Sequence, residues 1–476
     1  MPENSPYDEV LQRALVQALS HLHKLEDAAA SATATKEELR ARLDRPLTSD
    51  GSDPVRVIDD LVKDSAGGWL GSAGGRFFGW VIGGSLPAAL AADWLTSAWD
   101  QNAALYACGP AAAVIEEVCG RWLKELLGLP PAAGFALVTG CSMSHVTCLA
   151  AARHQLLARI GWDVENKGLF GAPKIYILSG EHRHGSIERA ARLLGLGREC
   201  IIDLPINDTG TLPVKSLSDD VNKRSGDLII VLLQAGDINT GSFDSFEDLI
   251  PLAHERGAWV HVDGAFGLWA NASPKFCYLL RGVEMADSWS TDGHKWLNVP
   301  YDCGYAFVAD ANAHCASLSH RASYLTHDGD ARDQIDWNPE WSRRARGIAT
   351  YAAIRQLGRQ GIADLVERTC QFAKDIATRI GALRGAELAW EPTLNQGLVR
   401  FPHMSPVATE ADHAIQTDEV IERILRTGEA FFGGTTWRGK RCMRISVCNW
   451  QTSAIDVERA VRAVESALQG NGRPES

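Results

Sequence analysis

Lys295 is the residue of this chain best placed to do covalent chemistry, because it lies between His294 and Trp296 rather than in a polar surface segment. A lysine that is withdrawn from water loses its proton more easily, and the free amine can form an imine with a carbonyl compound. Asp263 ends the apolar run 258–263 and is suited to hold a protonated ring nitrogen. The pair predicts pyridoxal phosphate as the cofactor, with Lys295 on its aldehyde and Asp263 on its pyridinium nitrogen.

Each of these two residues has a simpler explanation when it is taken alone. Lys295 could be a structural lysine near a loop, and Asp263 could cap the turn after a strand. Their combination favours the cofactor, because a carboxylate beside the pyridine nitrogen keeps it protonated and lets the ring accept electrons from a carbanion. Gly264 and Ala265 follow Asp263, and their small size leaves room for a flat ring.

Gly140, Cys141 and Ser142 lie between a predicted strand and a predicted helix. A glycine turn before a helix offers free backbone N–H groups and a favourable dipole to a phosphate. The signal is weak by itself, because many strand-to-helix turns look similar and the spacing matches neither a Rossmann nor a P-loop fingerprint. The phosphate hypothesis therefore depends on Lys295 and Asp263.

Further side chains suit the recognition of a substrate. His184 could stack on the cofactor ring or handle protons, although a helix-capping histidine is the simpler interpretation. Arg444 could grip a substrate carboxylate with two hydrogen bonds, and a buried structural ion pair is nearly as good an explanation. Phe77, Phe78 and Trp80 could line an apolar substrate pocket, although aromatic residues more often belong to a core.

The composition argues against several classes of protein. The 476 residues are 45% hydrophobic and carry a net charge of −12, and no basic stripe suggests a nucleic-acid partner. No apolar run has the length of about eighteen residues that a membrane-spanning helix needs. The 11 cysteines form no Cys-x-x-Cys pair, so neither a metal site nor a disulfide framework is expected. With an acidic N-terminus unlike a signal peptide, the pattern predicts a reduced cytoplasmic protein without a membrane partner.

The order of elements predicts an α/β fold with a mostly parallel central sheet. Continuous apolar strands alternate with helices, as in a sheet that is covered on both faces. We divide the chain into an N-terminal helical segment (1–105), a large cofactor-binding domain (106–347) and a small C-terminal α+β domain (348–476). The candidate strands are residues 135–139, 174–178, 200–204, 227–233, 258–262, 305–309 and 442–447, with helices at 144–160 and 185–194 among them. Ligands of such sheets bind at the carboxyl ends of strands, where Gly140 and Asp263 fall.

From about residue 75 to about residue 464, the chain resembles the group II pyridoxal-phosphate-dependent amino-acid decarboxylases. This family has fold type I, like aspartate aminotransferase, and includes the aromatic amino-acid and glutamate decarboxylases. The most specific segment is 294–303 (HKWLNVPYDC), which is similar to the family's lysine signature. Weaker likenesses are those of 261–265 (HVDGA), 184–190 (HGSIERA), 109–117 (GPAAAVIEE) and 443–448 (MRISVC).

The resemblance implies a role for each matched residue. Lys295 is expected to be the Schiff-base lysine, Asp263 the partner of the ring nitrogen and His184 the histidine that stacks on the ring. The expected cofactor-binding residues are Gly140, Cys141, Ser142, His184, Asp263, Ala265, Asp292, His294 and Lys295. The family forms homodimers with shared active sites, and the N-terminal helices resemble the segment that wraps the partner.

The chain departs from the family pattern at two places near the site. Asp292 stands where many members have a neutral residue close to the phosphate. The flexible loop of the family carries a tyrosine that returns a proton to the substrate, but this chain has no tyrosine between Tyr324 and Tyr351, and Gln334 or Ile335 falls near the expected place. We expect the charged segment 326–346 to be a lid, with a solvated loop as the plainer interpretation.

We therefore predict a lyase that acts at the α-carbon of an L-amino acid, with decarboxylation as the leading reaction. The missing tyrosine keeps decarboxylation-coupled oxidative deamination to an aldehyde as an alternative. A second alternative is β-elimination, such as cleavage of the C–S bond of a cysteine conjugate, and either would suit a natural-product pathway. A non-enzymatic binding protein is disfavoured because Lys295, Asp263 and His184 are all present.

Overall fold

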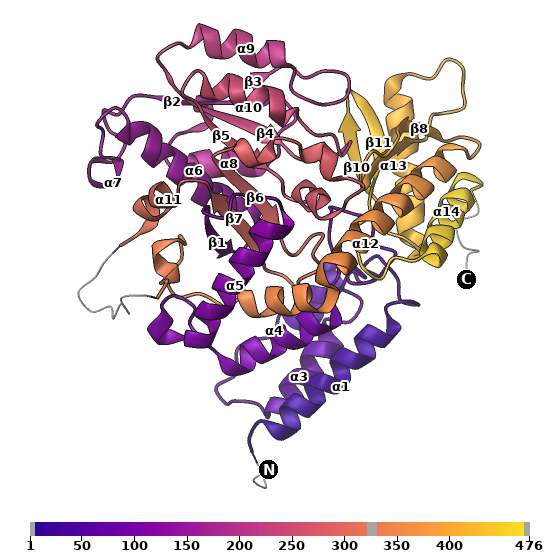
Figure 1. The fold of residues 1–476 in the computed structure, drawn as a ribbon. Coiled ribbons are helices and arrows are strands. Elements are labelled where there is room, and N and C mark those ends of the chain that lie inside the picture. The colour runs from indigo at the N-terminus through magenta and orange to yellow at the C-terminus, as the bar shows by residue number, and fades with distance from the viewer. Residues whose placement is uncertain (1–4, 321–330, 471–476) are drawn as a thin grey trace.

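The computed structural model describes residues 5–320 and 331–470 (Figure 1). Its N-terminal part is helical, as the sequence predicts, and α1 and α3 pack side by side at one end of the molecule. Within these residues, no helix has both the length and the apolar character that a membrane span requires. The helices before the first strand are α1 (Asp8–Lys24), α2 (Lys36–Leu43), α3 (Pro54–Asp64), α4 (Pro87–Trp99) and α5 (Pro110–Leu126).

A seven-stranded sheet forms the centre of the large region, and its strands lie in the order β1-β7-β6-β5-β4-β2-β3. Only β7 runs against its two neighbours, so the predicted, mostly parallel sheet is confirmed. The strands are β1 (Gly134–Val138), β2 (Ile175–Gly180), β3 (Ile201–Leu204), β4 (Leu228–Gln234), β5 (Trp259–Asp263), β6 (Ser288–Asp292) and β7 (Gly304–Val308).

Helices cover both faces of this sheet, and the alternation of side chains along β4 shows why its strands are apolar throughout. Ile230 and Leu232 face a cluster that includes α6 and α8, whereas Val231 and Leu233 face the cluster that includes α5 and α10. The helices of this region are α6 (Cys141–Ala158), α7 (Val164–Lys167), α8 (Gly185–Leu193), α9 (Val214–Lys223), α10 (Phe246–His254) and α11 (Ala311–Leu318).

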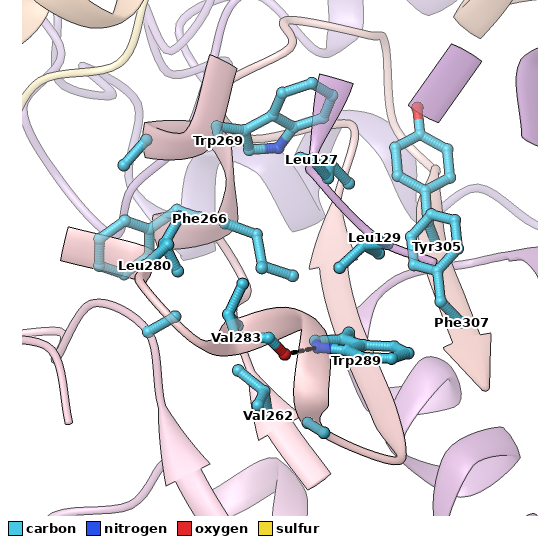
Figure 2. Packing of buried hydrophobic residues seen from close by; sticks show 14 of the residues in the cluster. Leu127, Leu129, Val262, Phe266, Trp269, Leu280, Val283, Trp289, Tyr305 and Phe307 are labelled. Atoms are coloured by element: carbon cyan, nitrogen blue, oxygen red, sulfur yellow. Dashed lines mark hydrogen bonds between the residues drawn. The ribbon is translucent and has the colours of Figure 1, made fainter. Parts of the chain in front are cut away.

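The core beneath the edge of the sheet is rich in aromatic side chains (Figure 2). Trp269, Trp289 and Tyr305 are almost completely buried. Trp289 donates its ring N–H to the Val283 carbonyl at 2.8 Å, so its one polar atom is satisfied. Burying a large apolar side chain stabilises the fold by roughly 2 to 3 kcal/mol. This packing fixes the ends of β5, β6 and β7, from which the candidate site residues project.

The C-terminal part contains a second, antiparallel sheet in the order β10-β11-β9-β8, which packs against helices. The predicted strand at 442–447 is confirmed as part of β11. The elements are α12 (Gly347–Gly381), β8 (Glu387–Trp390), β9 (Gln396–Arg400), α13 (Glu410–Thr427), β10 (Gly433–Trp437), β11 (Lys440–Ser446) and α14 (Ala454–Leu468). A kink in α12 at Gly358, where φ is +62°, turns the chain toward this sheet.

Only the second part of the charged segment 326–346 belongs to the described residues. Residues 321–330 lie outside the described residues, so the lid expected there stays a prediction. From residue 331 onward the segment is packed into the body of the protein, and Gln334 and Ile335 are 0% and 1% exposed. A solvated or mobile loop is therefore the wrong description of residues 331–346, because charged side chains of this part, such as Arg343, pair with groups inside the protein.

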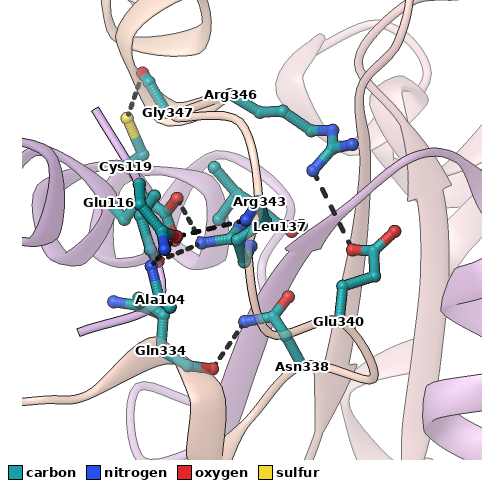
Figure 3. A network of polar contacts seen from close by, with 12 residues as sticks. Ala104, Glu116, Cys119, Leu137, Gln334, Asn338, Glu340, Arg343, Arg346 and Gly347 are labelled. Atoms are coloured by element: carbon teal, nitrogen blue, oxygen red, sulfur yellow. Dashed lines mark hydrogen bonds and ion pairs between the residues drawn. The ribbon is translucent and has the colours of Figure 1, made fainter. Parts of the chain in front are cut away.

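A buried ion pair holds this half of the segment (Figure 3). Arg343 donates to Glu116 at 2.8 Å and to the carbonyls of Ala103 and Leu137, and both charged side chains are buried. Burial raises the pKa of Glu116, and the charge of Arg343 opposes that rise. The hydrogen bonds to β1 and α5 compensate for the removal of two charges from water.

Candidate active site

The ends of four strands meet at one edge of the central sheet. Asp263 is the last residue of β5, and Asp292 is the last residue of β6. Gly304 begins β7 and pairs with Asp292 on one side and with Val138, the end of β1, on the other. A Cβ atom added at Gly304 would lie 2.4 Å from the Gly140 Cα, so this turn and the start of α6 approach β7 closely. The predicted position of Gly140 and Asp263 at strand ends is confirmed.

The amine of Lys295 is held by Asp292, with 3.1 Å between Nζ and Oδ2. Burial alone would lower the pKa of Lys295, but the negative charges of Asp292 and Asp263 outweigh this effect and hold the pKa above its usual value. Burial alone would raise the pKa of Asp292. Lys295 and His294 lower this pKa by a larger amount, so that the net shift is downward. The expectation that desolvation frees this lysine of its proton is therefore wrong in this arrangement, because Asp292 reverses the sign.

Asp292 also contacts the start of α6 and a histidine. Its Oδ1 accepts the backbone N–H of Cys141 at 2.7 Å and lies 3.6 Å from His294 Nε2. His294 Nδ1 accepts the backbone N–H of Cys303 at 3.1 Å, so the neutral ring carries its proton on Nε2, toward Asp292. The ring of His294 stacks on Tyr301 with 4.3 Å between centroids, which fixes its orientation.

Asp263 is backed by a chain of buried polar side chains. Its Oδ1 accepts the Ala265 N–H at 3.2 Å, and its Oδ2 lies 3.6 Å from His145 Nε2. His145 Nδ1 lies 2.9 Å from His261 Nε2, and His261 Nδ1 lies 2.9 Å from Ser288 Oγ. Burial lowers the pKa of His261 to about 3, so this ring is neutral. The carboxylate of Asp263 therefore has a fixed, fully buried support behind it.

Gly83 brings a distant segment against the lysine. A Cβ atom at this position would lie 1.9 Å from the Lys295 carbonyl oxygen, so no larger residue fits without moving the lysine backbone. Trp80 and Val81, just before it, have φ values of 51° and 58°. Positive φ is strained for a β-branched residue such as Val81, and such strain collects at functional sites. The segment after Phe78 is thus held in a specific shape beside Lys295.

His184 caps the N-terminus of α8 and lies close enough to Asp263 and Lys295 to be affected by their charges. Its Nδ1 accepts hydrogen bonds from the backbone N–H and the hydroxyl of Ser186, so the neutral ring carries its proton on Nε2. The pKa of His184 is lowered, first by loss of solvent and then by Lys295 and Arg444, against the opposing effect of Asp263. The capping interpretation of His184 is confirmed, and the cap leaves Nε2 free for the site.

The predicted substrate-binding residues have different surroundings. Phe78 is 0% exposed in the C-terminal core, and Phe77 is buried and stacked on Phe431 at 4.3 Å, so neither opens onto a pocket. This corrects the expectation for both, because their side chains pack against the C-terminal part of the fold, on Phe431 and Phe432. Trp80 is 51% exposed, and its Nε1 lies 3.9 Å from the position of a Cβ at Gly433.

Arg444 lies beside Trp80, because Gly433 is its cross-strand partner in the small sheet. Burial lowers the pKa of Arg444, and the nearby Asp237 opposes this shift. The ion pair that was the alternative explanation of Arg444 is not found among the described residues. Its guanidinium group has Asp237 as a nearby charge, but it can still donate to a ligand.

Residues at the start of α6 complete the site. Cys141, His145 and Asp263 have their polar atoms within 4.8 Å of one another. Burial raises the pKa of the Cys141 thiol well above its usual value, so the thiol is protonated. Ser142 is exposed in the first turn of α6, and Ala265 is half-buried next to Asp263.

These residues fit pyridoxal phosphate at three points. Lys295 offers a side-chain amine, Asp263 offers a buried carboxylate for a protonated ring nitrogen, and His184 offers an exposed ring close enough for both charges to act on it. The start of α6 offers N–H groups for a phosphate, although Asp292 already contacts one of them.

Comparison with known proteins identifies the family. The family model described as the pyridoxal-dependent decarboxylase conserved domain matches residues 55–403. The chain belongs to this family. It is a pyridoxal-phosphate-dependent lyase that acts at the α-carbon of an L-amino acid, chiefly by decarboxylation.

Individual relatives agree with this assignment. The aromatic-L-amino-acid decarboxylase of Bacillus atrophaeus is 23% identical over 95% of this chain and 93% of its own length. The 4-hydroxyphenylacetaldehyde synthase of Rhodiola rosea is 28% identical over 87% of this chain and 85% of its own length. The crystal structure of Oryza sativa TDC with PLP and tryptamine superimposes with a TM-score of 0.91, at 22% identity, over 99% of this chain and 100% of that one. The predicted fold type is confirmed.

Sequence reasoning missed the histidine chain behind Asp263. His145 and His261 were read only as parts of motifs, because their contacts join residues more than a hundred positions apart. One available signal was that two histidines stand in segments predicted to be buried, where a polar side chain needs a partner.

Proposed function

We propose that Lys295 attaches the cofactor, that Asp263 contacts its ring nitrogen and that His184 lies against its ring. Pyridoxal phosphate supplies a ring that accepts the electrons released when a bond at the α-carbon breaks. Asp263 holds the proton on the ring nitrogen, and His145 and His261 keep water away from its far side. Cys141, Ser142 and His294, with Gly140, Ala265 and Asp292, surround the remainder of the cofactor.

Substrate recognition is assigned to the surface formed by Trp80 and Arg444. The exposed indole of Trp80 offers an apolar face, and the guanidinium of Arg444 offers two parallel N–H donors to a carboxylate. Arg444 lies near the site, because its charge acts on His184. The half-buried Arg444 is the observation that carries this proposal, because its guanidinium makes no ion pair or hydrogen bond within the described residues and can donate to a carboxylate of a ligand.

Covalent labelling tests the cofactor assignment. Borohydride treatment of the protein with pyridoxal phosphate should fix the label on Lys295, as found by peptide mapping. A label on another lysine overturns the assignment. For the substrate surface, Arg444→Lys and Arg444→Gln should raise KM for the preferred amino acid more than they lower kcat, because they weaken binding rather than the reacting centre.

A second candidate reaction is oxidative deamination coupled to decarboxylation. The amino acid, O₂ and H₂O would give the aldehyde, CO₂, NH₃ and H₂O₂. Two observations favour it: the absence of a tyrosine between Tyr324 and Tyr351, and the similarity to the Rhodiola rosea 4-hydroxyphenylacetaldehyde synthase. Gln334 is buried and carries no acidic proton, so it is no substitute for a tyrosine.

Product analysis separates the candidates. The protein is incubated with a panel of L-amino acids and S-substituted cysteines, with and without oxygen. Amine equal to the CO₂ released, without oxygen uptake, establishes simple decarboxylation. Aldehyde and H₂O₂ that depend on oxygen establish the second candidate. A keto acid formed with loss of a thiol would establish the β-elimination that the sequence left open.

We further propose that the working unit is a homodimer joined through the N-terminal helices. No residue of α1 is buried, and its apolar side chains Leu11, Val16 and Leu19 are 58%, 50% and 42% exposed. Leu61 of α3 is 53% exposed beside them, and a groove of about 650 Å³ runs between the two helices. Apolar surface of this kind is typical of a protein–protein interface.

Light scattering tests the dimer. Leu11→Glu combined with Leu61→Glu should shift the mass from two chains toward one. Phe170→Glu is the matched control, since Phe170 is 98% exposed and follows α7, which lies away from α1 and α3 (Figure 1). A parent protein that is active as a monomer would refute the proposal.

We also propose a reducing, cytoplasmic setting. Eight of the eleven cysteines are buried in the structure as free thiols. Cell fractionation tests this location, and an extracellular protein with paired cysteines would contradict it.

A further inference from the structure

Asp292 sits where an anion would be bound. Its carboxylate is 2% exposed and accepts the Cys141 N–H at the start of α6 at 2.7 Å. It also faces His294 Nε2 at 3.6 Å and Lys295 Nζ at 3.1 Å. A helix N-terminus, an imidazole N–H and an ammonium group are donors that proteins turn toward phosphate. Here these three donors surround the carboxylate of Asp292 instead.

Few hydrogen-bond donors near the start of α6 remain for the phosphate of a cofactor. Ser142 follows Cys141 in the first turn of α6, is exposed, and makes no side-chain hydrogen bond in the described part of the chain. A phosphate that binds to Ser142 and the start of α6 comes close to the Asp292 carboxylate. Because the Asp292 carboxylate is buried, its negative charge is poorly screened and repels the phosphate.

We infer that Asp292 is an internal competitor for the phosphate of the cofactor. The inference rests on the proposed function, because it takes the cofactor to be attached at Lys295. Asp292 weakens binding of pyridoxal phosphate through charge repulsion at the phosphate, and it holds the Lys295 amine as an ammonium ion. The first effect concerns only a phosphorylated ligand, whereas the second concerns every aldehyde that reacts with Lys295.

This difference allows the two effects to be separated. Asp292→Asn has the same shape, and its amide oxygen can still accept the Cys141 N–H. The variant should bind both pyridoxal phosphate and pyridoxal more readily, because the lysine is released. Only pyridoxal phosphate should gain the additional affinity that comes from removing the charge.

The experiment measures dissociation constants of both aldehydes by absorbance, for the parent and for Asp292→Asn, starting from protein freed of cofactor. The ratio of pyridoxal to pyridoxal-phosphate constants should rise by about tenfold or more in the variant. Asp237→Asn is the matched control, since Asp237 is a buried aspartate that accepts from Asn239 and Thr240 and not from α6. Its ratio should equal that of the parent.

A ratio that is unchanged or lower in Asp292→Asn overturns the inference, and a lower one makes Asp292 a supporting residue of the phosphate site. Melting curves of the cofactor-free proteins show that the variants are folded. If the parent binds pyridoxal phosphate but borohydride fixes it elsewhere than on Lys295, the proposed function fails instead. The two failures are therefore distinguishable.

Discussion

At the scale of single residues, Asp263 has the strongest expected effect on chemistry. Replacing it by asparagine removes the charge that faces the ring nitrogen but keeps the shape and the Ala265 N–H contact. We expect cofactor attachment to persist and kcat to fall by about a hundredfold or more, because the ring becomes a poorer electron acceptor.

Absorbance of the bound cofactor and steady-state kinetics check this prediction together. Asp244→Asn provides the comparison for loss of a buried carboxylate outside the site, since Asp244 accepts from the backbone N–H groups of Leu212 and Gln234. Turnover of Asp263→Asn within a few-fold of the parent would remove Asp263 from its proposed role.

At the scale of elements, Gly83 should control where Lys295 lies. In Gly83→Ala the new methyl group cannot fit 1.9 Å from the Lys295 carbonyl, so the backbone of one segment must shift. We expect a loss of stability of about 1 to 3 kcal/mol and a lower fraction of borohydride-fixed cofactor. Gly51→Ala is the control, since no atom lies within 4 Å of its Cβ position. Equal behaviour of the two variants would contradict the close approach.

The ion pair between Glu116 and Arg343 should stabilise the junction of α5, β1 and the segment before α12. Glu116→Ala leaves a buried guanidinium charge without its partner and should destabilise the protein by about 3 to 5 kcal/mol in chemical denaturation. Adding Arg343→Met should recover part of this loss, because the uncompensated charge disappears. A double variant less stable than the single one would be evidence against this account.

The element boundaries show where local pattern suffices. The apolar strands β4 and β5 and the helix α8 begin and end close to the predicted residues. The strand β6 was missed because Ser288, Ser290 and Asp292 make it look like a loop. Its polar side chains are buried and bonded to residues of β5 and α6, which no local pattern reveals. The division into 1–105, 106–347 and 348–476 stays a prediction.

At the scale of the whole molecule, buried histidines should make stability depend on pH. Burial lowers the pKa of His314 to about 3, whereas an unfolded histidine has a pKa of about 6.5. Between these values the unfolded chain binds a proton that the folded chain does not. The free energy of unfolding therefore falls as the pH drops below about 6.5, by about 2 kcal/mol for this residue at pH 5.

Denaturation at pH 7 and pH 5, at one protein concentration, checks this sign. In His314→Gln the loss of stability between the two pH values should be smaller than in the parent by about 2 kcal/mol. The comparison between proteins cancels the contributions of His261 and of the carboxylates. A loss as large in the variant as in the parent would show that His314 is not buried in its neutral form.

By itself, the sequence predicted the fold class and the cofactor, which are confirmed, and it singled out Lys295, Asp263 and His184, whose roles stay a proposal, because apolar periodicity and motif spacing are local properties of the chain. Only the tertiary structure decided what surrounds them. It placed Asp292 on the Lys295 amine, and so reversed the expected shift of the lysine pKa. It also buried Phe77, Phe78 and Gln334, which composition alone could not separate from exposed residues. Charge proximity and burial arise from segments far apart in sequence, so they exist only once the chain has folded.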